Sequence, residues 1–95
     1  MTADNESKET MRLDQLLVFL RFAKTRSVAR AMIESGRMRL NSSRITKISH
    51  DVAVGDVLTF ALRGEVCVAL IEQLPQRRLS AKDASKAWTQ LGSRI

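Results

Sequence analysis

The spacing of apolar residues changes at Gly36, and this change constrains the fold more than any other feature of the sequence. Before Gly36, apolar residues recur at helical spacing, which predicts helices over Arg12 to Phe22 and Arg26 to Ser35. After it, polar and apolar residues alternate from Arg37 to Leu40, as in a half-buried strand, and Asn41-Ser42-Ser43 then turns the chain. Gly36 itself suits the left-handed conformation that commonly follows a helix. The chain is therefore expected to begin with two helices and then enter a sheet.

The middle of the chain is predicted to continue the sheet. A looser stretch runs over Arg44 to Val54 and leads to a turn at Gly55-Asp56. Two β-rich runs follow, Val57 to Leu62 and Val66 to Leu74, and Arg63-Gly64 between them favours a hairpin.

The C-terminal segment is predicted to form a helix. Pro75 ends the preceding strand, and Ser80 with Asp83 three residues later resembles a capping box. The helix that follows is expected to carry Trp88 and Leu91 on its apolar side. We therefore expect an α+β fold in three parts: a disordered leader over residues 1–10, a domain over residues 11–74 and a helical extension over residues 75–95.

Positive charge is concentrated in one part of the chain. The formal net charge is +6, with 16 Lys and Arg against 10 Asp and Glu. Residues 11–50 hold nine basic and two acidic residues, a net charge of +7, whereas residues 1–10 carry −2 and residues 51–95 carry +1. This asymmetry favours a polyanionic partner such as a nucleic acid.

Several classes of protein are disfavoured by the composition. Cys67 is the single cysteine and His50 the single histidine, so no internal disulfide, zinc-ligand set or nucleophile and base pair is evident. We therefore expect no enzyme activity, no metal and no cofactor. The longest apolar runs are too short to span a membrane, and the polar N-terminus does not resemble a signal peptide. The expected location is the cytoplasm.

Six basic residues are expected to converge at one corner of the domain. They are Arg21, Lys24, Arg26, Arg30, Arg37 and Arg39. Arg26 and Arg30 lie four positions apart on the second predicted helix, where like charges cost about 0.2 to 0.5 kcal/mol, so helix stability does not explain this pair. Such a cluster suits phosphate binding, and the alternative is a solvated basic face without a specific ligand.

The start of the second predicted helix offers another way to bind phosphate. Lys24-Thr25-Arg26-Ser27 places two cations beside the free N–H groups of a helix start, where an anion is favoured. The alternative is that Thr25 or Ser27 only caps the helix.

The order and spacing of further residues carry a resemblance to a known family. They are Arg12-Leu13-Asp14, Leu16-Leu17, Arg21, Lys24-Thr25-Arg26, Ala29, Ile33, Gly36, Leu40-Asn41, Lys47 and Val54-Gly55-Asp56. This pattern resembles the S-four RNA-binding domain (S4 domain), which is named after the fourth protein of the small ribosomal subunit. The resemblance implies two helices packed on a small, mostly antiparallel sheet, with the second helix and the following loop against RNA. In whole-chain layout the sequence is similar to the ribosome-associated heat-shock protein fifteen subfamily, also through Gln76-Arg77-Arg78.

Charge and resemblance together predict which residues contact RNA. They are Arg12, Arg21, Lys24, Thr25, Arg26, Arg30, Arg37, Arg39, Asn41, Arg44 and Lys47. Residues assigned to shaping the fold are Asp14, Gly36, Gly55 and Asp56, and Asn41 has the alternative of serving only its turn.

The resemblance also implies a partner and a role. The partner would be structured ribosomal RNA, with transfer RNA as a further candidate, on the large ribosomal subunit during stress or stalled translation. A monomer is expected. The alternatives are an accessory RNA-binding subunit of an RNA-modifying enzyme and a basic module that binds an acidic protein.

Overall fold

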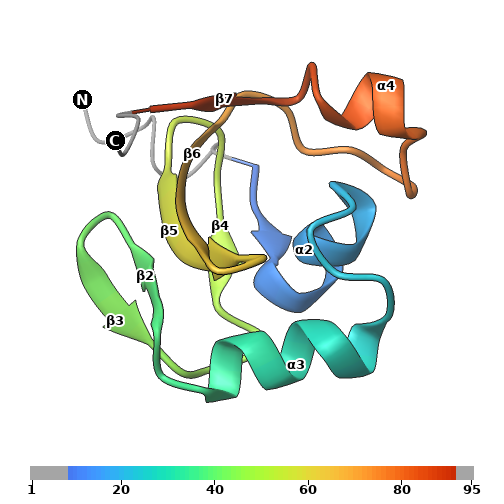
Figure 1. Cartoon of the computed structure of the whole chain (residues 1–95). Coiled ribbons are helices and arrows are strands. Elements are labelled where there is room, and N and C mark those ends of the chain that lie inside the picture. The colour runs from blue at the N-terminus through green and yellow to red at the C-terminus, as the bar shows by residue number, and fades with distance from the viewer. Residues whose placement is uncertain (1–8, 92–95) are drawn as a thin grey trace.

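The computed structural model describes residues 9–91 and has the predicted α+β fold (Figure 1). The elements are β1 (Met11–Arg12), α2 (Leu13–Phe19), α3 (Arg26–Glu34), β2 (Met38–Leu40), β3 (Ser43–Ile45), β4 (Asp51–Val52), β5 (Val57–Leu62), β6 (Glu65–Ile71), α4 (Ala81–Ala84) and β7 (Trp88–Gln90). Figure 1 shows α2 and α3 beside the twisted sheet, with α4 in the upper right corner. Most of the predicted leader lies outside the described residues. Within residues 9–91, no helix is long and apolar enough to cross a membrane.

The main sheet has five antiparallel strands in the order β3-β2-β5-β6-β7, and β1 pairs with β4 in a separate small sheet. Two pairs of strands are joined by two-residue turns with positive φ at both positions. These are Asn41 (52°) and Ser42 (77°) between β2 and β3, and Arg63 (54°) and Gly64 (82°) between β5 and β6. Positive φ at both positions defines the type I′ turn, whose twist matches that of the flanking strands.

The hydrophobic core lies between the two N-terminal helices and the inner face of the sheet. Its fully buried members include Leu13, Leu16, Leu17, Ile33, Leu58 and Ile71. The ring of Phe22 lies 4.8 Å from that of Phe60 on β5 and 4.9 Å from that of Trp88 on β7, measured between centroids. This aromatic cluster joins the α2–α3 connection to the central strand β5 and to the edge strand β7.

The first helix is shorter than predicted at both ends. Arg12 belongs to β1 because it pairs with Asp51, and the helix begins at Leu13. At the other end, Arg21 has a φ of 66°, its N–H donates to the carbonyl of Val18, and the N–H of Phe22 donates to Leu17. This is a Schellman motif, which ends the helix before Phe22.

The second helix agrees with the prediction to within one residue. Gly36 follows it with a φ of 79°, which confirms the expected left-handed cap. Its buried side is narrower than the sequence pattern indicated, because Ala29 and Ile33 are buried whereas Val28 is 45% exposed and Met32 is partly buried.

The stretch Arg44 to Val54 was predicted to be loose but contains β4 and most of β3. Both strands are very short, so their alternation of polar and apolar residues gives almost no signal. Their existence depends on partners elsewhere in the chain, β2 for β3 and β1 for β4. The turn before β3 also contains only Asn41 and Ser42, because Ser43 is already paired with Leu40.

The prediction for the C-terminal segment was only partly correct. Ser80 caps α4 by accepting a hydrogen bond from the N–H of Asp83 (3.2 Å), as expected, but the helix ends at Ala84. Trp88 lies on β7 and pairs with Ile71, so it is not a helical residue, and β6 ends at Ile71 rather than at Leu74. The segment forms a strand because the edge of β6 offers it backbone hydrogen bonds, which a longer helix would not make.

Candidate nucleic-acid interface

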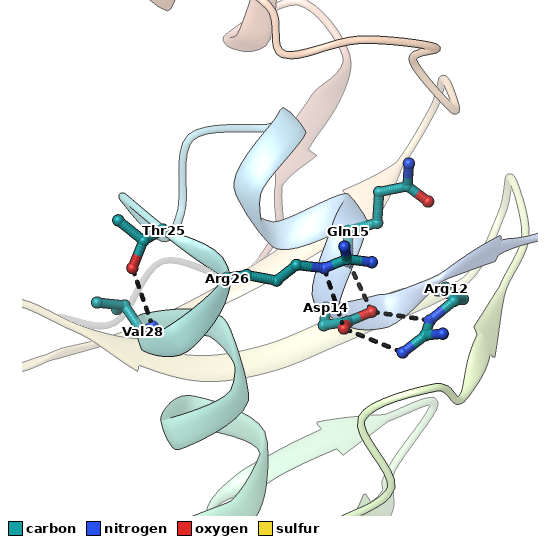
Figure 2. A network of polar contacts seen from close by, with 6 residues as sticks. All are labelled: Arg12, Asp14, Gln15, Thr25, Arg26 and Val28. Atoms are coloured by element: carbon teal, nitrogen blue, oxygen red, sulfur yellow. Dashed lines mark hydrogen bonds and ion pairs between the residues drawn. The ribbon is translucent and has the colours of Figure 1, made fainter.

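A buried carboxylate organises the start of both long helices. Asp14 is 0% exposed, and its two carboxylate oxygens accept hydrogen bonds from Nε and Nη2 of Arg12 at 3.1 and 3.2 Å (Figure 2). Nε of Arg26, at the start of α3, lies 3.4 Å from the same carboxylate. The arginine side chains remain 46% and 52% exposed. Asp14 therefore holds two half-exposed guanidinium groups in fixed orientations, which confirms its assignment as a residue that shapes the fold.

The loop after β3 covers the start of α2. The N–H of Leu13 donates to the carbonyl of His50 (2.9 Å) and the N–H of Asp14 to that of Ile48 (3.2 Å). These bonds occupy backbone donors that would otherwise be free at this helix start. They also bring the loop that carries Lys47 next to the Asp14 cluster, which consists of Arg12, Asp14 and Arg26.

The start of α3 is more open. The Oγ1 atom of Thr25 accepts a hydrogen bond from the N–H of Val28 (3.2 Å), so the predicted helix cap is confirmed. A cap satisfies only part of the set of N–H groups that a helix start leaves unpaired. Lys24, Thr25, Arg26 and Ser27 are all exposed, so an anion has access to this position.

Arg26 and Arg30 differ in their acidic neighbours, although both lie on α3 four positions apart. Both are exposed, and each lies three positions before a buried residue of α3, so the two arginines flank the buried stripe of Ala29 and Ile33. Arg26 has the carboxylate of Asp14 beside it, which offsets its repulsion with Arg30 and gives it a structural role. Among the described residues, no acidic side chain lies within 4.0 Å of Arg30. Arg30 is therefore the better test of a role in binding alone.

The β2–β3 hairpin presents a second pair of arginines. Arg39 and Arg44 are directly opposite each other in the register, and both are exposed, whereas Met38 and Ile45 beside them are buried. Like charges in this position destabilise a strand pair by roughly 0.2 to 1 kcal/mol. The pairing thus weakens the hairpin slightly and concentrates positive charge on its outer side.

Asn41 has its side chain occupied within the protein. Its Nδ2 donates to Asp56 (3.1 Å), and its Oδ1 accepts from the N–H of Val57 (2.8 Å). Asp56 also accepts from the N–H of Ala53 (2.9 Å), and Gly55 has a φ of 96°. These contacts favour the alternative in which Asn41 serves the turn, and they support the assignment of Gly55 and Asp56 to the fold.

Arg21 does not join the corner to which it was assigned. Its Nη1 donates to the carbonyl of Leu79 at 3.2 Å, so its guanidinium group lies against the C-terminal segment. The remaining predicted cations lie on β1, on α3 and the residues beside it, on the β2–β3 hairpin and in the loop after it. Figure 1 shows α3 and this hairpin in its lower part. We call this set the basic face, which consists of Arg12, Lys24, Arg26, Arg30, Arg37, Arg39, Arg44 and Lys47, all exposed.

Comparison with known proteins places this surface in a family. The model of the S4 domain matches residues 11–58, which is the region that carries the whole basic face. The chain belongs to the S4 domain family. It is therefore an RNA-binding protein, in agreement with the resemblance seen in its sequence.

The S4 domain relatives include heat shock protein 15 from several bacteria. A heat shock protein 15 homolog from Haemophilus influenzae is 36% identical over 89 residues, which cover 94% of this chain and 67% of that protein. Heat shock protein 15 of Escherichia coli K12 is 33% identical over 75 residues, which cover 79% of this chain and 56% of that protein. The trimeric structure of Vibrio cholerae heat shock protein 15 has a TM-score of 0.81 and 34% identity, with 87% of this chain and 83% of that one covered. This chain thus spans between about half and two thirds of the length of the two relatives from Haemophilus and Escherichia.

Two features of this S4 domain escaped sequence reasoning. The contact between Asp14 and Arg26 joins separate helices, and no local pattern indicates it. The pairing of Arg39 with Arg44 did have a signal, because Asn41-Ser42 suits a two-residue turn that would place the two arginines opposite each other.

Proposed function

We propose that this S4 domain protein is a non-catalytic binder of structured ribosomal RNA that acts on the large ribosomal subunit in stress or stalled-translation rescue, with transfer RNA as a second ligand. The observation that carries the RNA part is the Asp14 cluster, in which a buried carboxylate fixes two exposed guanidinium groups. Arginine side chains held in this way lose little entropy on binding, and their planar form suits phosphate oxygens.

The shape of the basic face supports structured RNA as the ligand. Its cations come from β1, from the side of a helix, from a hairpin and from a loop, so they are spread over a surface and do not line a narrow channel. Duplex RNA is recognised mostly through its phosphates and its shape. Pocket-like enclosure of single bases is not required for such binding.

The environment of the candidate nucleophile supports a non-catalytic role. Burial raises the pKa of the Cys67 thiol, whose Sγ lies 3.4 Å from Oε1 of Gln90, so this group is kept protonated within the sheet. The ring of His50 contacts the carbonyl of Asp51 through Nδ1 (3.0 Å). Neither group is positioned beside the other as a nucleophile and its base would be.

The ribosomal part of the proposal rests on the resemblance to the heat shock protein 15 relatives, whereas the expected cytoplasmic location rests on the composition of the sequence. The expectation of a monomer remains a prediction, and the Vibrio cholerae relative is trimeric in its solved structure. Light scattering on the purified chain at several concentrations would measure its state directly.

Co-sedimentation tests the proposal. Purified chain is mixed with separated large or small ribosomal subunits and centrifuged through sucrose at low salt. We expect it to travel with large subunits, and the double variant Arg39→Gln/Arg44→Gln to remain nearer the top. Titration with salt should give a slope of log affinity against log salt of about −3.5 to −4.5 if about five phosphates are neutralised. Equal recovery with both subunits, or a slope near zero, would contradict the proposal.

Ribosomal RNA from a deletion strain tests the non-catalytic part. Mass spectrometry of its nucleosides should show every modification that the parent strain has. A modified nucleoside that is missing, and that the purified chain alone restores, would show that the protein is an enzyme.

A further inference from the structure

Four cations lie outside the region matched by the S4 domain model, in one short segment. They are Arg77, Arg78, Lys82 and Lys86, and all four are exposed. We call residues 76–86 the C-terminal arm. Asp83 is the one acidic residue in it, and no ion pair within 4.0 Å involves any of the four cations among residues 9–91. Within the protein, their charges are therefore directed to solvent.

The arm is held firmly against the end of the first helix. The N–H of Leu79 donates to the carbonyl of Phe19 (3.0 Å), and the carbonyl of Leu79 accepts from Nη1 of Arg21 (3.2 Å). Ala84 and Ala87 are buried, which fixes the end of the arm as well. Cations on a fixed backbone lose less conformational entropy when they bind than cations on a free tail do.

Arg21 has a conformation that the fold alone does not favour. It occupies the left-handed position of the Schellman motif, where glycine is the usual residue because a Cβ there costs about 1 kcal/mol. An arginine at this position adds a fifth exposed cation beside the arm and ties the arm down through its guanidinium group. Strained residues of this kind often mark a functional site.

The arm lies apart from the part of the basic face on the β2–β3 hairpin, whereas Lys24 is only three residues from Arg21. In Figure 1 the arm and α4 are at the upper right, whereas α3 and the β2–β3 hairpin are in the lower part, and the longest dimension of the molecule is 40 Å. We therefore expect a single short duplex that is bound at the hairpin not to reach the arm.

We propose that the C-terminal arm, together with Arg21, is a second RNA-contact surface, which binds phosphates of a separate stretch of the same structured RNA. The inference rests on the proposed RNA-binding function and deepens it. Because lysine and arginine contacts to phosphate carry no sequence information, the arm would add affinity and fix the orientation of the protein without reading bases.

The test compares RNA of two lengths. One ligand is a hairpin with a stem of about 6 base pairs, far fewer than the roughly 16 base pairs that a double-stranded RNA-binding domain spans, and the other is a ribosomal RNA fragment several times larger. Binding is measured for the wild-type chain, for Arg77→Gln/Arg78→Gln and for Arg77→Lys/Arg78→Lys, which keeps the charge. Both positions are exposed, so thermal melts should coincide.

For the larger RNA we expect the Gln variant to bind about tenfold more weakly and the salt slope to become shallower by about 1.4 to 1.8, as for two lost phosphate contacts. For the short hairpin the change should stay within about twofold, and the Lys variant should behave as wild type. Hydroxyl-radical footprinting of the larger RNA with the wild-type chain should show two separate protected regions. The Gln variant should lose only one of them.

Three results would overturn the inference. The first is a Gln variant that binds the larger RNA as tightly as wild type. The second is an equal loss of affinity for both RNAs, which would indicate a general charge effect. The third is a Gln variant that leaves both footprints intact. In each case the wild-type chain still binds RNA and Arg39→Gln/Arg44→Gln still weakens it, so the proposed function stands. If the wild-type chain binds neither RNA and instead captures an acidic protein surface, the proposed function and this inference both fail.

Discussion

The buried carboxylate of Asp14 lies 3.4 Å from Nε of Arg26, and this contact joins the start of α2 to the start of α3. Through it, one residue contributes both to the stability of the fold and to the orientation of a surface cation. The same carboxylate holds Arg12 with two hydrogen bonds. A substitution at Asp14 therefore tests whether RNA affinity depends on the orientation of Arg12 and Arg26 or only on the net charge of the protein.

We expect Asp14→Asn to lower both stability and RNA affinity. The asparagine keeps an acceptor for the N–H of Gln15 but loses the charge-assisted contacts to both arginines, which are worth about 1.5 to 3 kcal/mol. The lower end applies because the guanidinium groups are half exposed and water replaces part of the contact. Urea titrations and RNA titrations measure the two effects.

The control for this change is Asp83→Asn, which also removes one negative charge, from an exposed position on α4. It should leave stability almost unchanged. If Asp14→Asn binds RNA more tightly because the net charge rises, the orientation of Arg12 and Arg26 does not matter for binding.

Arg30→Gln and Ile33→Ala should show opposite patterns on the same helix. Arg30 is exposed and has no acidic neighbour in the described chain, so its loss should change the free energy of unfolding by no more than about 0.5 kcal/mol. RNA affinity should fall about tenfold to hundredfold, as for a lost charge-assisted contact. Ile33 is fully buried, and its truncation should cost about 2 to 5 kcal/mol without altering the affinity of the folded protein.

Ile33 suits this comparison because it is fully buried, whereas Met32 on the same helix is only partly buried. Thermal melts and RNA titrations on both variants are the measurements. An Arg30→Gln variant that unfolds and retains its affinity when folded would make this side of α3 structural.

Ser42→Gly should stabilise the protein by up to about 1 kcal/mol, because Ser42 has a φ of 77° in a type I′ turn that favours glycine there. RNA affinity should not change, since the arginines of the hairpin keep their register. Gly64→Ala is the reverse control, because Gly64 has a φ of 82° in the equivalent turn and should lose stability. Chemical denaturation measures the free energy of unfolding of both variants. A destabilised Ser42→Gly variant would show that the serine hydroxyl contributes a contact of its own.

Stability should fall in alkaline solution through Cys67. Burial raises the pKa of its thiol in the folded state, so above the ordinary value of 9.0 the unfolded chain releases this proton more readily than the folded one. The free energy of unfolding then decreases as the pH rises, since the folded state binds more protons. Urea midpoints between about pH 7 and pH 10 should fall more steeply for wild type than for Cys67→Ala. Parallel pH profiles for the two proteins would contradict this account.

The sequence by itself determined the local elements and the partner class. The helix over Arg26 to Glu34, its Thr25 cap, the turn at Gly36 and the central hairpin all follow from local spacing and local turn chemistry, which act within a few residues. The concentration of positive charge in residues 11–50 likewise indicated a polyanionic ligand without any structure.

Only the tertiary structure decided which distant groups meet. Trp88 is in a strand because it pairs with Ile71 at the edge of β6. Arg21 lies away from the other cations because its side chain donates to the carbonyl of Leu79. Asp14 on α2 forms an ion pair with Arg26 on α3. Each of these contacts joins residues far apart in the chain, and its free energy depends on the burial and positioning that the folded core provides. The spacing of apolar residues within a short segment carries no information on the free energy of such long-range contacts. The individual contacts of the surface are therefore seen only in the folded structure.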